Sequence, residues 1–186
     1  MNPAQFPSRT PAPGRRLFWW WGTALLFSSL ALGADNMHFR GALVTEPCVV
    51  APGDEHLALD FGNVVDKYLY QNQRSPSQVL VLHLQQCDST LAKSFKVTFN
   101  GTQNPALPGL LALDPGSQAS GLAIGLETAE GRPWPLNQPG AGQALVAGDN
   151  QIEVRAYLQG EPAALANRSI EKGPFTALAT FRLDYE

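Results

Sequence analysis

Short segments in which apolar and polar residues alternate recur along the chain from residue 37 onward. They lie at 37–43, 57–61, 80–84, 95–99, 122–126, 152–158 and 175–185. Alternation of this kind is typical of strands that bury one face. Gly, Pro, Asn and Asp separate the segments and supply the backbone angles that turns require. Seven or so short strands, in a chain with 17 Gly and 15 Pro, predict an antiparallel β-sandwich.

The stretches between these segments are predicted to be connections. Residues 103–120 and 131–148 are rich in Gly, Pro and Gln, which indicates surface loops. Residues 161–169 could hold one helical turn, and we interpret them as a further loop. The sequence therefore predicts an all-β protein with almost no helix.

Residues 1–34 are typical of a secretory signal peptide. Three arginines and no acidic residue precede an apolar run at 17–32, and the small residues Gly33 and Ala34 follow it. We expect cleavage after Gly33 or Ala34, which leaves one domain at 35–186. The alternative is an uncleaved anchor, since the run is only slightly shorter than the roughly 17 to 25 residues that span a bilayer.

The predicted mature chain is acidic. The whole chain has 13 Lys and Arg and 16 Asp and Glu, and the leader removes three arginines, which leaves 10 − 16 = −6. Nucleic acid and anionic membranes attract basic surfaces, so this balance argues against both as partners.

Two cysteines, Cys48 and Cys87, lie in the mature part. Because the chain carries an export signal, we expect a disulfide formed in an oxidising compartment. Closing a loop of about 40 residues would stabilise the fold by about 4 kcal/mol. A metal-binding or catalytic pair would need neighbouring ligands, but His38, His56 and His83 are scattered without ligand spacing.

The sequence contains none of the common catalytic signatures. It has no nucleophile elbow, no HExxH and no GxxxxGK. We interpret Trp134, Tyr157 and Tyr185 as packing residues rather than as a sugar-stacking platform. The expectation is a protein that is not an enzyme and that has no cofactor, no metal and no direct small-molecule substrate.

Several sequence pieces taken together resemble the subunits of chaperone-usher pili, in particular the minor and adaptor subunits of P pili and type 1 pili. They are "FRGALVTEPCVV", a second cysteine at the end of a strand, "ALPGLL", "GLAIGL", "RAYL" and "GPFTALATFRLDY". Single pieces are weak evidence, but their order and the cysteine spacing form a specific set. The resemblance covers essentially all of 35–186.

This resemblance implies an incomplete immunoglobulin-like antiparallel β-sandwich that lacks its seventh strand. A donor strand from another chain would complete it, first from a periplasmic pilus chaperone and then from the N-terminal extension of a neighbouring pilus subunit. The other implied partner is the outer-membrane usher. The implied location is the fimbrium on the surface of a Gram-negative bacterium, reached through the periplasm.

The resemblance also assigns roles to particular residues. Residues 35–45 would be the donor extension, whose groove-facing residues are Met37, Phe39, Gly41 and Leu43. The groove wall and chaperone-binding strand would comprise Phe175, Ala177, Ala179, Phe181, Leu183 and Tyr185, with the carboxylate of Glu186 held by basic chaperone residues. The alternatives are that 35–45 is the protein's own first strand and that the later residues are ordinary core.

The expected function is that of a structural minor or adaptor subunit of an adhesive pilus, which contributes to cell adhesion. An adhesin is less favoured, because adhesins of this family carry an additional lectin domain for which 152 residues leave no room. A tip-located or terminating subunit stays open, and termination would require a blocked groove. An unrelated secreted immunoglobulin-like binding module would instead fold as a soluble monomer without a chaperone.

Overall fold

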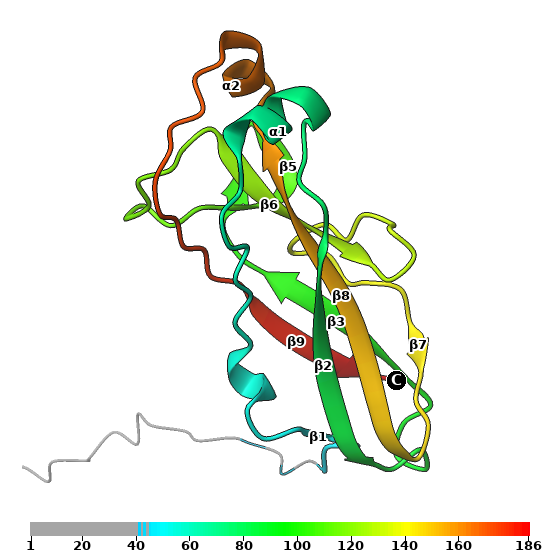
Figure 1. Cartoon of the computed structure of the whole chain (residues 1–186). Helices are drawn as coiled ribbons and strands as arrows, with labels where there is room; N and C mark the ends of the chain where they lie inside the picture. The colour runs from blue at the N-terminus through cyan, green and yellow to red at the C-terminus, as the bar shows by residue number, and fades with distance from the viewer. Residues whose placement is uncertain (1–40, 42, 44) are drawn as a thin grey trace, which may run out of the picture. The chain divides into compact units, whose positions relative to one another are not determined.

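The alternating segments pair into two antiparallel sheets (Figure 1). The computed structural model describes residues 41, 43 and 45–186, so the predicted signal peptide and the donor residues Met37 and Phe39 lie outside the described residues. In chain order the elements are β1 (Val49–Val50), the 3₁₀ turn η1 (Asp54–His56), α1 (Asp66–Asn72), β2 (Gln78–Cys87), β3 (Ser94–Asn100), β4 (Gln103–Asn104), β5 (Leu107–Ala112), β6 (Leu122–Thr128), β7 (Gln143–Ala144), β8 (Gly148–Gly160), α2 (Pro162–Asn167) and β9 (Thr180–Tyr185). Neither helix is long and apolar enough to cross a membrane.

The larger sheet has the strand order β1-β2-β8-β6-β5-β4, and the smaller has the order β7-β3-β9. Both contribute to one apolar core, in which the alternating side chains of β2, β3 and β8 meet. Its most deeply buried large side chains are Leu84, Phe95, Val97, Leu136, Ile152, Val154 and Leu158. The prediction of an all-β antiparallel sandwich is confirmed.

The expected disulfide between Cys48 and Cys87 is present. It ties the chain just before β1 to the last residue of β2, where the pairing of β2 with β8 shifts register between Leu84 and Cys87. The structure shows no group of three or more candidate metal ligands among the residues that it describes.

The prediction that 103–120 and 131–148 are loops is only partly right, because both stretches also contain strands. The first stretch contains β4 and β5, and β5 pairs with β6 through Leu111 opposite Ile124. Pro108 and Gly109, at a φ of 87°, interrupt the alternation that marks other strands. The second stretch contains β7 and the buried side chains Trp134, Leu136 and Leu145, so it covers the core.

The interpretation of residues 161–169 as a loop is also corrected. Residues 161–169 contain α2, whose first turn holds Pro162, where a missing N–H costs no helical hydrogen bond. The unforeseen helix α1 buries only Leu69. Each helix has seven residues or fewer, too few for a helical period to show in the sequence.

Two predicted strand segments lie wholly or partly outside the two sheets. Leu57 to Phe61 has no strand assignment, and the segment predicted at 175–185 pairs with β3 only from Thr180 onward. Their apolar side chains nevertheless pack against the core. These two segments form the site described below.

A polar cluster covers the larger sheet on the face away from the core. Arg74 donates hydrogen bonds to both carboxylate oxygens of Glu127, at 2.9 and 3.1 Å, and Ser77 donates another. The guanidinium carbon of Arg74 lies 3.6 Å from the ring centroid of Tyr157, and that ring lies on Gly125. A side chain at Gly125 would displace the ring, so the stack depends on glycine there.

We expect Glu127→Gln to destabilise the domain by about 1 to 2 kcal/mol at neutral pH, because charge-assisted hydrogen bonds are lost. Burial acts to raise the pKa of Glu127, but the hydrogen bonds from Ser77 and Arg74 and the charge of Arg74 outweigh it, and the pKa falls below its ordinary 4.5. A carboxylate whose pKa is lower in the folded than in the unfolded state stabilises the fold at pH values above its unfolded-state pKa. This stabilisation is lost as pH falls through the folded-state pKa. The difference between wild type and variant in urea unfolding should therefore be constant above about pH 5.5 and shrink below pH 4.5. A pH-independent difference would contradict this account.

Candidate functional site: an open apolar groove

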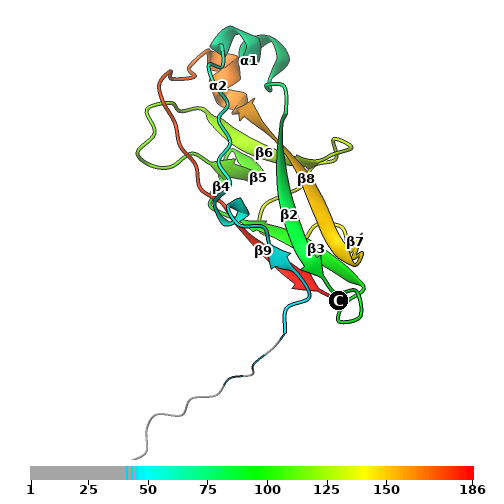
Figure 2. The same ribbon diagram turned by 60° about the horizontal axis from the view of Figure 1, so that its bottom comes forward.

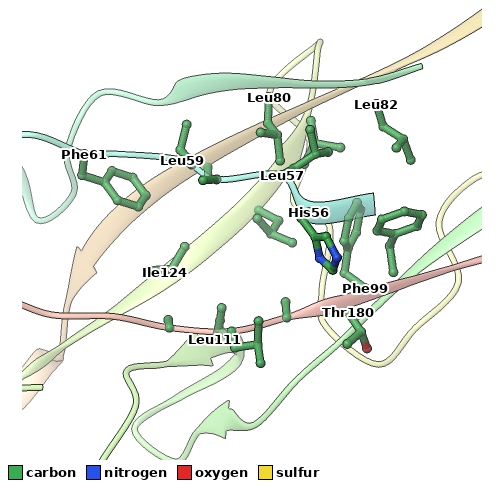
Figure 3. A pocket seen from close by; sticks show the side chains of 18 of the residues that line it. His56, Leu57, Leu59, Phe61, Leu80, Leu82, Phe99, Leu111, Ile124 and Thr180 are labelled. Carbon is green, nitrogen blue, oxygen red and sulfur yellow. The ribbon is translucent and has the colours of Figure 1, made fainter. Parts of the chain in front are cut away.

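A groove of about 810 Å³ opens between the two extended segments (Figure 3). One wall carries Leu57, Leu59 and Phe61, and the other carries Ala177 and Ala179, continuing into Phe181 of β9. On both walls the side chains that pack against the core are every second residue, as in an extended backbone, and Ala58 and Leu178 between them also line the groove. The groove is therefore bounded by two strand-like segments.

The floor of the groove is apolar. It is formed by Leu80, Leu82, Phe99, Leu111, Ile124, Leu126, Val154 and Ala156, which come from β2, β3, β5, β6 and β8. Both sheets thus contribute floor residues, and several of these residues are also part of the buried core. The groove is an exposed strip of the domain's own core.

The backbone of both walls is unpaired over the groove. Among the described residues, no backbone-to-backbone hydrogen bond involves Leu57 to Phe61 or Ala177 to Ala179. β9 pairs with β3 along one edge and is the last strand of its sheet, so its other edge has no strand beside it in this sheet. Because unsatisfied sheet edges are ready to pair with another chain, the site can accept a strand through main-chain hydrogen bonds.

A second cavity of about 190 Å³ lies at one end of the groove, and Phe175 lines it. The ring of Phe175 lies 6.1 Å from that of Phe61, so the two walls approach each other there. Val64 and Leu69 of the α1 region also line this cavity. We call this end of the domain, with α1, α2 and residues 168–173, the helical end.

Leu183 and Tyr185, which the sequence placed on the groove wall, lie farther along β9 and do not line the groove. Leu183 is opposite Val97, and the Tyr185 ring lies 6.5 Å from that of Phe95. Both side chains pack on the closed part of the core, where β3 and β9 pair fully.

Glu186 closes β9 against β3. One oxygen of its main-chain carboxylate accepts hydrogen bonds from the amides of Lys93 and Ser94, at 2.7 and 3.0 Å. Its side-chain carboxylate lies 2.6 Å from the Lys96 ammonium. The contact of the main-chain carboxylate of Glu186 with basic residues of a chaperone stays a prediction.

Two of the predicted donor residues, Gly41 and Leu43, lie in the described part of the chain, and both are exposed, Leu43 fully at 104%. No atom lies within 4 Å of where a Cβ would stand on Gly41. The insertion of these residues into a neighbouring groove stays a prediction.

The rim at the opposite end of the groove is polar, with Glu55, His56 and Thr180 among its residues. Asp54 anchors this rim, because one carboxylate oxygen accepts the His83 amide at 2.7 Å and lies 2.9 Å from a His83 ring nitrogen. The amide hydrogen bond first, and then the ring, hold the pKa of Asp54 below its ordinary value. The contact fixes the start of the first wall against β2.

Sequence reasoning missed the first wall and the whole floor as parts of the site. The alternation at Leu57, Leu59 and Phe61 indicated a strand, but nothing local distinguishes a strand beside a groove from one inside a sheet. Leu111 lay in a predicted loop, so no signal marked it.

Comparisons with known proteins agree with this architecture. The family model described as "Fimbrial protein" matches residues 37–186. The Fimbria A protein of Serratia marcescens is 33% identical over 170 residues, covering 88% of this chain and 95% of that protein. The fimbrial adapter PapK of Escherichia coli is 32% identical over 173 residues, covering 88% and 97%.

The same fold occurs in the crystal structure of the P pilus rod subunit PapA, with a TM-score of 0.66 and 24% identity. The match covers 76% of this chain and all of that one. These similar proteins are fimbrial subunits rather than enzymes. The chain belongs to the fimbrial protein family, the subunits of chaperone-usher pili.

Proposed function

We propose that this protein is a minor or adaptor pilus subunit that polymerises by donor-strand exchange. The observation that carries the proposal is the groove, whose floor is apolar and whose two walls have no backbone partner among the described residues. A strand from another chain would pair with both walls and cover the floor at the same time.

The predicted donor extension has the pattern that this groove requires. Met37, Phe39 and Leu43 alternate with polar or small residues, so one face of an extended 35–45 is apolar. Each large side chain that becomes fully buried would contribute roughly 1.5 to 3 kcal/mol. Gly41 would allow the donor backbone to approach the floor closely where a side chain would not fit.

An unfilled groove is a hazard for the free subunit, because exposed apolar surface beside open strand edges promotes aggregation. A periplasmic chaperone that lends a strand would protect it during transit. The outer-membrane usher would then receive the protected subunit, and the next subunit's extension would replace the chaperone strand.

The open groove supports a subunit that accepts a donor over one that terminates the fibre, since termination would require a blocked groove. The chain is about equally identical to an adapter, at 32%, and to the Fimbria A protein, at 33%, so sequence identity does not favour one position in the fibre. What supports the adaptor position is the short predicted donor extension at 35–45, which suits minor subunits better than an abundant rod subunit.

Expression of the mature chain in the periplasm with and without its chaperone tests this function. We expect aggregation or degradation without the chaperone and a soluble one-to-one complex with it. A stable, soluble monomer formed without help would contradict the proposal.

A further inference from the structure

We propose that Gly101, held in place by the side chain of Asn137, sets how much room the groove leaves beside Leu111 and thereby selects which donor strand fits. This inference rests on the proposed function and names residues that determine the specificity of the same groove. Neither Gly101 nor Asn137 lines the groove, so both act by positioning residues that do.

The second wall of the groove, Ala177 to Ala179, stands free because the chain that follows β3 turns away from it. β3 pairs with β9 only as far as Asn100, and the next residue, Gly101, belongs to no strand. The Thr102 carbonyl then accepts the Ala112 amide at 2.8 Å, and the chain enters β4, which lies beside β5 in the larger sheet (Figure 2). The second wall is therefore left without a strand on the side where β3 would otherwise continue.

Two anchors hold the second wall on either side of this gap. Near the helical end, Ser117 Oγ accepts a hydrogen bond from the Thr176 amide and donates one to the Thr176 carbonyl, both at 3.1 Å, and the Asp114 amide donates to the same carbonyl at 2.8 Å. From Thr180 onward the wall pairs with β3. Between the anchors, no backbone-to-backbone hydrogen bond of the described residues involves Ala177 to Ala179, so packing decides where the wall lies.

Gly101 is a residue on which this part of the wall packs. A Cβ placed on Gly101 would lie 3.4 Å from the Leu178 carbonyl oxygen and 3.7 Å from the Ala179 Cβ, which are ordinary contacts. The same Cβ would lie 2.6 Å from Leu111 Cδ1, which is closer than two carbon atoms can pack. Gly101 thus lies where the second wall meets the groove floor, and a side chain there would have to displace the end of Leu111.

The groove is the space into which Leu111 can be displaced. Leu111 is 5% exposed, belongs to β5 and lies on the groove floor (Figure 3). Because protein interiors are close-packed, its other sides are occupied by neighbouring atoms. A Leu111 side chain pushed away from Gly101 would therefore enter the groove and take up room that a donor side chain needs.

Asn137 keeps Gly101 from shifting to relieve such an overlap. Its side-chain oxygen accepts the Gly101 amide at 3.1 Å, and its side-chain NH2 donates to the Gly101 carbonyl at 3.0 Å. Its own amide donates to the Phe99 carbonyl at 2.7 Å. Asn137 has a φ of 61°, in the left-handed region that asparagine adopts more readily than most residues. One side chain thus makes the two hydrogen bonds that a neighbouring strand would make to Gly101.

The first experiment measures the affinity of the mature chain, freshly released from its chaperone, for the 35–45 peptide. We expect Gly101→Ala to weaken binding about 10-fold, because the displaced Leu111 side chain occupies part of the groove. Leu111→Val removes the Cδ atoms that overlap, so Gly101→Ala should change the affinity by less than about twofold in that background. Asn137→Gly removes both side-chain hydrogen bonds and keeps the left-handed backbone, so it should also reduce the effect of Gly101→Ala.

The matched control for the added methyl group is Gly142→Ala. A Cβ on Gly142 would contact only Lys96 Cε, at 3.7 Å, and the Gly142 backbone is not left-handed. This variant should bind the peptide with the wild-type affinity.

A change of specificity separates a positioning role from a general loss of stability. Peptides with Met37→Ala, Phe39→Ala or Leu43→Ala should each bind the wild-type groove more weakly than the unchanged peptide, because each buries less apolar surface. On the Gly101→Ala variant, the peptide whose shortened side chain faces Leu111 should bind at least as well as the unchanged peptide, since the missing atoms leave room for Leu111. A loss of stability alone would weaken all four peptides by the same factor.

The outcomes distinguish this inference from the proposed function. If Gly101→Ala leaves binding unchanged, weakens every peptide equally, or acts as strongly with Leu111→Val as without it, the inference is overturned while the proposed function stands. Failure of the 35–45 peptide to bind the wild-type groove would contradict the proposed function, and this inference with it.

Discussion

Ala179→Asp, in the domain freshly released from its chaperone, is expected to abolish binding of the donor peptide. Ala179 lines the groove and is half-buried, packed against the core. Burial of an unpaired carboxylate under the donor would cost several kcal/mol, which corresponds to a loss of affinity of about 100-fold or more. The affinity for the 35–45 peptide, measured by fluorescence or calorimetry, checks this.

Thr176→Asp is the matched control for this substitution. Thr176 lies on the same extended segment, is exposed and does not line the groove. The same charge at Thr176 should change peptide affinity little. Equal losses from the two variants would mean that general charge repulsion, and not burial in the groove, weakens the donor.

Removal of the disulfide should produce the second large effect. Cys48 and Cys87 are buried, at 3% and 5% exposure, and are 39 residues apart in the sequence. Without the bridge the unfolded chain gains conformational entropy, which lowers the free energy of unfolding by about 4 kcal/mol. That is a large share of the roughly 5 to 15 kcal/mol by which domains are stable.

The measurement is urea unfolding of the peptide-filled domain for wild type and for the double variant Cys48→Ala, Cys87→Ala. Wild type under reducing conditions serves as the control, since it should lose nearly the same free energy without any change of sequence. A loss below about 1 kcal/mol in both cases would contradict a structural role for the bridge.

Alternation identified the strands wherever one face is buried continuously. The predicted segments at 80–84, 95–99, 122–126 and 152–158 all lie inside observed strands. This works because the two-residue period is a local property of extended backbone. It failed at β5, where Pro108 and Gly109 interrupt the period although the segment still pairs with β6.

The site was predictable only in part, and the reason is geometric. Ala177, Ala179 and Phe181 alternate, so they could be assigned to an apolar face from sequence. Whether that face meets a neighbouring strand or an open groove depends on what is packed beside it, which no local pattern records. For example, the sequence pattern predicts that Leu59 is a core residue of a strand, whereas in the structure Leu59 lines the groove.

Hydrogen exchange at the backbone amides of the two groove walls tests donor-strand completion most directly. In the mature chain freshly released from its chaperone and before a donor is added, the amides of Leu57 to Phe61 and Ala177 to Ala179 should exchange rapidly, because they have no backbone partner there. Addition of the 35–45 peptide should protect alternate amides on both walls, and a peptide with Phe39→Asp and Leu43→Asp should not. Walls already protected without a donor, or unchanged when the peptide is added, would contradict the account.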